Sequence, residues 1–231
     1  MNRRVWSGGA VLGVTIAALA FAGAARSGGD AAAPVLSPKP RSVVFSGGCF
    51  WGVQAVFQHV KGVQVATSGF AGGSAKTASY RLTTTGATGH AESVRVVFDP
   101  SVVSFEQLLD VFFTVAHDPT QLNRQGPDVG PQYRSAVWTT SEEQTKVVRD
   151  YIAGLERAKK FDRPIVTEVN SLDGFYPAEE YHQDYLIHHP NSAYIRINDL
   201  PKLRHLEKAF PKLWRDETAP WRAETAEQAS S

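Results

Sequence analysis

The sequence predicts an α+β fold, in which a single two-layer domain packs helices on a mixed, mostly antiparallel sheet. Strand-like and helical segments alternate, the strands are short, and the connections between them differ in length. No glycine-rich phosphate-binding motif is present, because Gly69–Gly73 has neither the spacing nor the lysine of a P-loop. These observations favour a variant of the ferredoxin-like arrangement over a doubly wound parallel sheet.

Residues 1–25 have the pattern of a secretory signal peptide. Arg3 and Arg4 give a positively charged start, Ala10–Ala25 is apolar, and Ala22-Gly23-Ala24 matches a small-residue cleavage site. The apolar run is shorter than the ~20 residues of a membrane-spanning helix, so an uncleaved N-terminal anchor is the alternative. We therefore expect an exported protein, either periplasmic or secreted.

The rest of the chain divides into three parts. Residues 26–40, rich in glycine, alanine and proline, are expected to form a flexible linker. Residues 41–215 form the predicted domain, and residues 216–231 are expected to be a disordered tail. The formal net charge of +1 lacks the basic excess of a general nucleic-acid surface, so we expect no nucleic-acid partner. We also expect a monomer.

The elements of the domain follow from side-chain periodicity and capping signals. We predict strands over Val43–Ser46, Gly62–Thr67, Glu92–Asp99, Tyr133–Thr139 and Ile165–Val169. We predict helices over Gly52–His59, Phe105–Ala116, the stretch after Ser141, Ala178–His188 and Pro201–Phe210. Ser104 and Ser141 each begin a capping-box sequence. The predicted helix after Ser141 carries the i,i+4 pairs Glu142/Lys146 and Glu156/Lys160. Two polar stretches, Ser68–Gly89 and Thr120–Gln132, are predicted to be long loops with a function.

Cys49 is the single cysteine of the chain, which excludes an intramolecular disulfide and a cysteine zinc cluster. Gly47 and Gly48 precede it between a predicted strand and a predicted helix. This places the thiol at a helix N-terminus, where unpaired N–H groups and the helix dipole lower the pKa of a thiol. A free cysteine is otherwise a small buried apolar side chain. Phe50 and Trp51 are expected to form an apolar wall beside the sulfur.

Glu92 has the same parity along its predicted strand as the apolar residues Val94, Val96 and Phe98. Its carboxyl group is therefore expected to point toward the core, although a glutamate at a strand end is usually solvated. A desolvated carboxyl group has a raised pKa and stays protonated near neutral pH, as a general acid requires.

Several other polar residues border the two predicted loops. Tyr80 and Tyr133 can donate hydroxyl hydrogen bonds to a substrate oxygen, although most tyrosines are half-buried packing residues. Asp128 by default is a turn residue. His90 is a candidate base for Cys49, as in cysteine hydrolases. The other histidines have no spacing that forms a credible metal site, so we expect no metal.

Taken together, these residues resemble peptide methionine sulfoxide reductase of type A over about Val43–Asn198. The most specific motif is Gly48-Cys49-Phe50-Trp51-Gly52. The supporting motifs follow in the expected order: Thr88-Gly89-His90-Ala91-Glu92 after Tyr80, Gln132-Tyr133-Arg134-Ser135 after Asp128, and Tyr181-His182-Gln183 before Tyr185-Leu186. The resemblance implies that residues 41–215 are a catalytic domain that needs no metal or organic cofactor.

The resemblance also implies a role for each site residue. Cys49 attacks the sulfoxide sulfur, and Phe50 and Trp51 hold the substrate methyl group. Glu92 protonates the sulfoxide oxygen, and this transfer is aided by Tyr80, Tyr133 and a water placed near Asp128. The implied products are methionine and a sulfenic acid on Cys49. The implied substrates are the S epimer of free methionine sulfoxide and of the same residue in oxidised proteins.

Two departures from the family pattern stand out. Many members carry resolving cysteines near the C-terminus, but His189–Ile195 and the following tail contain none. The sulfenic acid therefore requires an external thiol, such as thioredoxin, glutaredoxin or a small thiol. Val129 stands where many relatives have a polar residue. Two alternatives remain open at this stage: a cysteine hydrolase that uses Cys49 and His90, and a non-catalytic domain that binds oxidised peptides.

Overall fold

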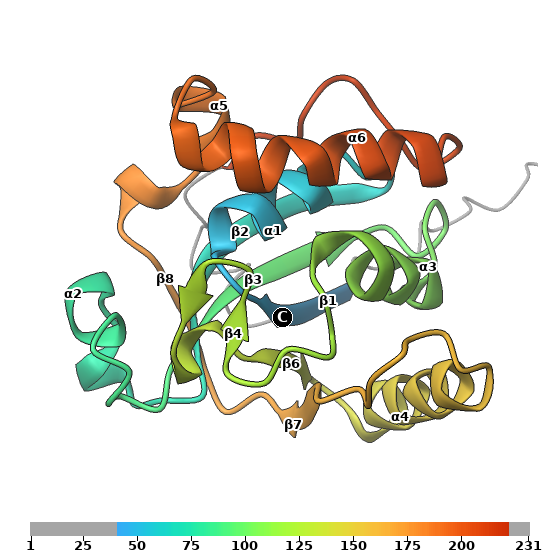
Figure 1. Cartoon of the computed structure of the whole chain (residues 1–231), viewed down its shortest axis with the longest axis horizontal. Coiled ribbons are helices and arrows are strands. Elements are labelled where there is room, and N and C mark those ends of the chain that lie inside the picture. The colour runs from blue at the N-terminus through green and yellow to red at the C-terminus, as the bar shows by residue number, and fades with distance from the viewer. Residues whose placement is uncertain (1–40, 222–231) are drawn as a thin grey trace, which may run out of the picture. The chain divides into compact units, whose positions relative to one another are not determined.

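The structure is a computed structural model that describes residues 41–221 (Figure 1). The predicted signal or anchor, the predicted linker and residues 222–231 lie outside the described residues. The predicted start of the tail at residue 216 is wrong. The backbone N–H of Ala219 donates to the carbonyl oxygen of Gln58 at 3.1 Å, and that of Trp221 donates to the Asp184 carboxylate at 3.1 Å. No helix within 41–221 combines the length and the apolar character needed to cross a membrane.

The centre of the domain is a six-stranded sheet with the strand order β7-β6-β1-β3-β2-β8 among the described residues. Its strands are β1 Arg41–Gly47, β2 Val63–Ala71, β3 Ala91–Phe98, β6 Ser135–Thr139, β7 Glu168–Ser171 and β8 Phe175–Pro177. The β6–β7 pair is parallel and the other pairs are antiparallel. Two short strands, β4 Arg124–Gln125 and β5 Asp128–Val129, form a separate hairpin. The predicted mixed, mostly antiparallel sheet is therefore confirmed.

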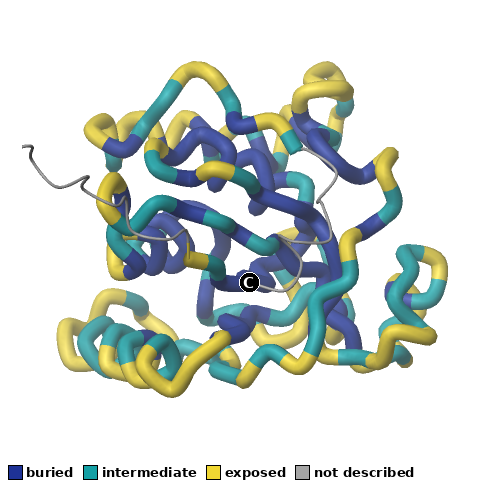
Figure 2. The backbone as a smooth tube through the Cα atoms, turned by 180° about the vertical axis from the view of Figure 1, so that it is seen from behind, coloured by how far each residue is buried: buried dark blue, intermediate teal, exposed yellow. Residues whose placement is uncertain are grey.

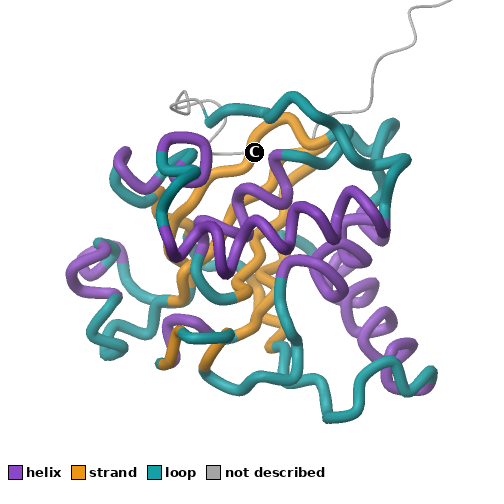
Figure 3. Tube along the Cα trace, turned by 45° about the horizontal axis from the view of Figure 1, so that its top comes forward, coloured by secondary structure: helices purple, strands orange, loops and turns teal. Residues whose placement is uncertain are grey.

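Helices cover one face of this sheet, with α6 lying beside α1 (Figures 1 and 3). The α-helices are α1 Phe50–Gln58, α2 Tyr80–Thr83, α3 Phe105–Val111, α4 Glu142–Arg157, α5 Tyr185–His188 and α6 Leu200–Ala209. Two π-helical turns, Phe112–Ala116 and Ile195–Asp199, continue α3 and lead into α6. Short 3₁₀ turns cover Ala75–Thr77, Pro131–Tyr133 and Glu180–His182.

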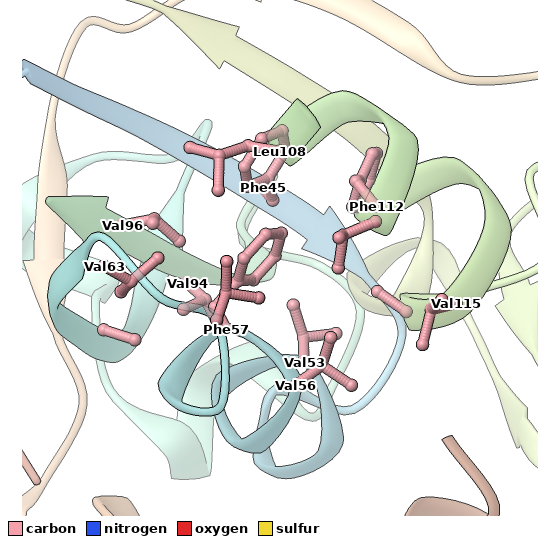
Figure 4. Packing of buried hydrophobic residues seen from close by; sticks show 14 of the residues in the cluster. Phe45, Val53, Val56, Phe57, Val63, Val94, Val96, Leu108, Phe112 and Val115 are labelled. Atoms are coloured by element: carbon pink, nitrogen blue, oxygen red, sulfur yellow. The ribbon is translucent and has the colours of Figure 1, made fainter. Parts of the chain in front are cut away.

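The main core lies between the sheet and these helices (Figure 4). Phe45 of β1 stacks on Phe57 of α1, with ring centroids 4.9 Å apart, and on Phe112, 4.6 Å away. Val94 and Val96 of β3 point into the same core and are fully buried. Burial of such side chains contributes about 1.5–3 kcal/mol each. The core thus fixes α1, and with it the turn that carries Cys49, against β1 and β3.

The opposite face of the sheet carries a smaller cluster, which includes Val44, Ala136 and Trp138. The Trp138 indole N–H donates to Ser46 Oγ at 2.8 Å, and the guanidinium of Arg134 lies 5.5 Å from the Trp138 ring. Seen from behind, the strands are largely buried while the outer helices and turns are exposed (Figure 2). Because the helices cover the other face of the sheet, the predicted two-layer arrangement is confirmed.

Local signals were most reliable where they act within one turn. The Ser104 capping box is present with both of its hydrogen bonds. At Ser141 only one forms, because the Gln144 side chain accepts from the Thr140 N–H instead. The predicted Glu142/Lys146 pair is wrong, since Lys146 is paired with Asp150.

Several element predictions differ from the structure, among them the predicted strand Ile165–Val169, since β7 spans Glu168–Ser171. Residues Ser68–Ala71 extend β2 because they pair with β3 and β8, and α2 forms within the predicted first loop. Ala178–His188 is broken by a left-handed residue, Asp184, with φ of 52°. The side chain of Gln183 fixes this break, donating to the Ser68 carbonyl oxygen at 2.8 Å and accepting from its N–H at 2.9 Å. Tyr133 lies in a 3₁₀ turn rather than in a strand, and the strand β6 begins two residues later, at Ser135.

Candidate active site

The turn between β1 and α1 places Cys49 at the N-cap of α1, as predicted. Gly48 has φ of +89°, a conformation that favours glycine. A Cβ at this position would lie 2.4 Å from Cβ of Gln125 in the β4–β5 hairpin. Gly48 therefore permits both the sharp turn and the close approach of the hairpin that covers the thiol.

The Cys49 thiol is buried, with 9% of the residue exposed. Burial raises the pKa of this thiol well above its usual range, and the nearby carboxyl groups of Glu92 and Asp199 raise it further. The Trp51 backbone N–H and the Lys202 ammonium act in the opposite direction on that pKa. The helix start therefore does lower the thiol pKa through the Trp51 N–H group, but the expected net lowering is wrong, because desolvation outweighs this contribution.

Glu92 points into the core, as the strand parity predicts, and is 2% exposed. Its Oε2 accepts a hydrogen bond of 3.0 Å from the backbone N–H of Phe50, the first residue of α1. Burial raises the pKa of Glu92 to about 8; the Phe50 N–H opposes this shift, and the charge of Asp128 adds to it. The carboxyl group is therefore protonated at neutral pH and lies at the helix start that carries the thiol.

Tyr80 and Tyr133 are both half-buried near this carboxyl group. Burial, followed by the charge of Glu92, raises the pKa of Tyr80 to about 12 and that of Tyr133 further still. Both hydroxyl groups therefore keep their protons and can act as hydrogen-bond donors. The backbone N–H of Tyr80 donates to the Glu179 carboxylate at 3.1 Å, which fixes the start of α2.

Phe50 and Trp51 form an aromatic group with their neighbours, as expected from the sequence. The Trp51 ring stacks on Tyr185, with centroids 3.7 Å apart and planes 6° apart, and its Nε1–H donates to His182 Nδ1 at 3.2 Å. The Phe50 ring lies 6.5 Å from that of Tyr80. The Tyr181-His182 motif thus supports the aromatic residues rather than a metal.

Asp128 lies in β5, where it accepts a hydrogen bond from the Tyr194 hydroxyl group at 2.5 Å. Tyr194 also meets the Trp51 ring edge-on at 5.7 Å. A cavity of about 210 Å³ opens beside the thiol. Its lining residues are Cys49, Gln125, Gly126, Pro127, Asp128, Tyr194, Ile197, Asn198 and Lys202. Val129 is 67% exposed and is not among them.

Sequence reasoning missed Tyr194 and Lys202, which line this cavity, and Asp199, which is paired with Lys202. Asp199 is buried, and its Oδ1 lies 3.2 Å from Lys202 Nζ. Both residues follow the last recognised motif, and no local pattern connects them with a thiol more than a hundred positions earlier in the chain. A signal was nevertheless present at Gly52, whose missing side chain leaves the space that this pair fills.

His90 does not act on Cys49. Its Nδ1 accepts from the Gly73 N–H at 3.2 Å, and its Nε2 is 3.0 Å from the carbonyl oxygen of Ser74. Both ring nitrogens are thus engaged with the backbone, so the hydrolase alternative lacks its base. Among residues 41–221, no group of three or more histidine, cysteine, aspartate or glutamate side chains is arranged to hold a metal ion.

A buried thiol next to a buried carboxyl group, on a helix-covered mixed sheet, fits a thiol-dependent enzyme. A family profile described as peptide methionine sulfoxide reductase matches residues 41–214. The chain therefore belongs to the peptide methionine sulfoxide reductase family, and its activity is the thiol-dependent reduction of methionine sulfoxide.

Curated relatives and solved structures agree with this assignment. The chain is 52% identical over 178 residues to peptide methionine sulfoxide reductase MsrA 2 of Mesorhizobium japonicum, which covers 77% of this chain and 91% of the relative. A crystal structure of reduced Mxr1 from Saccharomyces cerevisiae matches with a TM-score of 0.61 and 32% identity, over 67% of this chain and 88% of that one. Methionine sulfoxide reductase A of Corynebacterium diphtheriae matches with a TM-score of 0.60 and 38% identity, over 67% and 77%.

Proposed function

We propose that Cys49 is the nucleophile that attacks the sulfoxide sulfur and that Glu92 is the acid that protonates the sulfoxide oxygen. One observation carries this proposal. The Glu92 carboxyl group, with its pKa raised to about 8, is bonded to the N–H of Phe50, the residue next to the thiol. An acid that holds its proton at neutral pH and lies beside a nucleophile suits the reduction of an S=O bond.

In the proposed reaction, oxygen passes from the sulfoxide to the sulfur of Cys49. The thiol of Cys49 loses its proton to solvent, and the thiolate attacks the sulfoxide sulfur. Glu92 donates its proton to the oxygen, the sulfur–oxygen bond of the substrate breaks as the hydroxyl group moves to the Cys49 sulfur, and the transient bond between the two sulfurs breaks to release methionine. The products are methionine, reduced by two electrons, and a sulfenic acid on Cys49, whose sulfur is oxidised by two electrons. Glu92 regains its proton from solvent.

The neighbouring residues fit the remaining parts of a sulfoxide. The rings of Phe50 and Trp51 offer an apolar surface for the methyl group. Tyr80 and Tyr133 keep their hydroxyl protons and donate to the oxygen, and Asp128 holds a water beside it. Because the methyl surface and the donors lie in fixed positions, we propose that the enzyme accepts the S epimer, both as free methionine sulfoxide and in oxidised proteins.

An external thiol completes the proposed cycle, because the chain contains no second cysteine. Its thiolate attacks the Cys49 sulfenic acid and releases water, leaving a mixed disulfide. A second thiol of the reductant then attacks this disulfide and restores the Cys49 thiol. We propose a thioredoxin- or glutaredoxin-like protein, or a small thiol, as the reductant. The sequence pattern of residues 1–25 supports an exported enzyme, and N-terminal sequencing of the mature protein tests that location.

A single-turnover assay without reductant tests this function. The enzyme is mixed separately with the S and R epimers, methionine is counted, and the sulfenic acid is trapped with dimedone. We expect about one methionine per enzyme from the S epimer, no turnover of the R epimer, and one dimedone adduct on Cys49. Turnover of both epimers at similar rates, or turnover by Cys49→Ser, would contradict the proposal. Binding of the sulfoxide without any methionine would favour the non-catalytic alternative.

A further inference from the structure

A buried ion pair lies close to the catalytic thiol. Asp199 ends the π-helical turn Ile195–Asp199, and Lys202 is in the first turn of α6. Lys202 Nζ is 3.2 Å from Asp199 Oδ1, and the exposed fractions of the two side chains are 19% and 0%. Taking two charges out of water is costly, so a buried pair of this kind is weak evidence for a purely stabilising role.

The pair is held against the helix turn that follows Cys49. A Cβ on Gly52 would lie 2.0 Å from Asp199 Oδ1 and 2.8 Å from Lys202 Nζ. Both distances are too short for any side chain, so glycine at this position admits the pair to the first turn of α1. The carboxylate of Asp199 does not cap its own helix, since it makes no side-chain hydrogen bond to the α6 N-terminus.

Lys202 also lines the 210 Å³ cavity that opens on Cys49. Of the lining residues in the described part of the chain, it alone carries a positive charge, and Asp128 is the charged residue of opposite sign. Asp199 Oδ2 has no hydrogen-bond partner among residues 41–221. The carboxylate therefore accepts a hydrogen bond from Lys202 through Oδ1 only, and the Lys202 ammonium lies at the edge of the cavity.

We propose that Lys202, positioned by Asp199, supplies the positive charge that stabilises the thiolate of Cys49. This inference rests on the proposed function, because it concerns the anion that attacks the sulfoxide. The same anion is the leaving group when the second thiol breaks the mixed disulfide. Lys202 is thus a charge-supplying residue that acts through Cys49 in two steps of the cycle.

The electrostatics at the thiol agree with the geometry. Burial and the carboxyl groups of Glu92 and Asp199 raise the pKa of Cys49, whereas the Trp51 N–H and the Lys202 ammonium lower it. The other titratable groups near this region include Tyr80 of α2, Asp128 of β5, Tyr133 of the Pro131–Tyr133 turn and Tyr194 before Ile195–Asp199. Burial lowers the pKa of the two nearby histidines, His117 and His182, which keeps both neutral. None of them carries a positive charge.

The rate at which iodoacetamide alkylates Cys49 measures the thiolate directly. The chain contains no other cysteine, so the mass of the intact protein reports this one site. Iodoacetamide is uncharged, and a lysine therefore does not attract it. Measurements between pH 6 and 7 keep Glu92 mostly protonated, because its pKa is about 8. We expect Lys202→Met to slow alkylation about tenfold, equivalent to a rise of about one pKa unit, and Lys202→Arg to stay within about threefold of the unsubstituted chain.

A second pair of variants controls for folding, since Lys202→Met leaves a buried carboxylate without its partner. Asp199→Asn and the double variant Asp199→Asn/Lys202→Met differ only in the lysine, and neither contains that carboxylate. We expect slower alkylation in the double variant, while circular dichroism shows both to be folded. Equal alkylation rates within this pair, together with a Lys202→Met rate equal to that of the unsubstituted chain, would overturn the inference. Failure of the proposed function has a different signature, namely normal alkylation with no methionine formed from the sulfoxide.

Discussion

Glu92 and Asp199 are both buried carboxyl groups near the thiol of Cys49, but their partners differ. Glu92 accepts from a backbone N–H, which carries no net charge, and its pKa is raised to about 8. Burial raises the pKa of Asp199 as well, but Asp199 faces the Lys202 ammonium, whose charge opposes this rise. The partner therefore decides the role: a carboxyl group without a cation stores a proton, and one with a cation holds a charge in place.

The same contrast explains why two carboxyl groups can share one small site. If both were ionised without compensation, each would raise the pKa of Cys49 and oppose its deprotonation. A protonated Glu92 removes one of these repulsions, and Lys202 offsets the other. Glu92→Gln alters one side of this arrangement, and Gly52→Ala alters the other.

The largest effect is expected for Glu92→Gln. The amide keeps the size of the side chain but has no acidic proton to give, so the single-turnover rate with the S epimer should fall about 10²–10⁴-fold. Stopped-flow or quenched-flow measurement of methionine formation tests this. Glu143→Gln, on the exposed surface of α4, is the matched control and should retain the full rate. A loss smaller than about tenfold would mean that another group supplies the proton.

The pH dependence of stability provides the next largest effect. The pKa of Glu92 in the folded protein, about 8, is above its usual value of 4.5, so the folded state binds more protons between these values. This group therefore stabilises the fold at low pH, and the contribution is lost as pH rises from about 4.5 to about 8, by at most about 1.4 kcal/mol per pH unit.

Denaturant unfolding of the unsubstituted chain and of Glu92→Gln at several pH values isolates this contribution. The other titrating groups, His117 among them, are common to both proteins, so the difference in unfolding free energy reports Glu92 alone. The unfolding free energy of Glu92→Gln, relative to that of the unsubstituted chain, should increase as pH rises from 5 to 8. A constant difference across that range would show that Glu92 is not buried as a neutral acid.

Gly52→Ala tests the other side of the comparison. The added Cβ would lie 2.0 Å from Asp199 Oδ1, so the ion pair or α1 must move. Overpacking of this kind lowers the unfolding free energy by about 1–3 kcal/mol. Thermal unfolding measures the loss, and iodoacetamide alkylation at pH 7 should be slower than in the unsubstituted chain. Gly154→Ala on α4, where the nearest heavy atom to the new Cβ is 3.9 Å away, is the control with no expected loss.

How far the sequence predicts this site differs between the two carboxyl groups. Glu92 was predicted because strand parity is a local property, and Val94, Val96 and Phe98 set the buried face. Cys49 was placed at the helix start for a similar reason, from the glycines before it. Asp199 and Lys202 were not predicted, because they reach α1 only through the packing of α6 on it, which no short motif encodes.

The direction of the Cys49 pKa shift failed for the same physical reason. A helix N-terminus is visible in the sequence, but desolvation depends on the distant segments that cover the thiol, such as the β4–β5 hairpin. The break at Asp184 is also non-local, since Gln183 bonds to the backbone of Ser68 in β2. Local periodicity therefore predicted the frame of the site, and tertiary contacts determined its charges.

The smallest effect is expected for Tyr194→Phe, which removes the hydrogen bond to Asp128 and keeps the ring against Trp51. Loss of one hydrogen bond to a charged group lowers the unfolding free energy by about 1.5–3 kcal/mol at most, and less here because the cavity admits water to Asp128. We expect a decrease of about 1 kcal/mol in thermal or chemical unfolding and a single-turnover rate within about tenfold of the unsubstituted chain. An unchanged stability would mean that this hydrogen bond is not formed in solution.

The pH dependence of the single-turnover rate tests the central claim, that a protonated Glu92 works with a Cys49 thiolate whose pKa is higher. Below pH 8 the thiolate fraction rises about tenfold per pH unit while Glu92 stays protonated, so the rate should rise in parallel. Above pH 8 the loss of the Glu92 proton cancels the gain in thiolate, and the rate should level off. The slow residual rate of Glu92→Gln should instead continue to rise beyond pH 8. A rate for the unsubstituted chain that rises through pH 9.5 without an inflection would contradict the account.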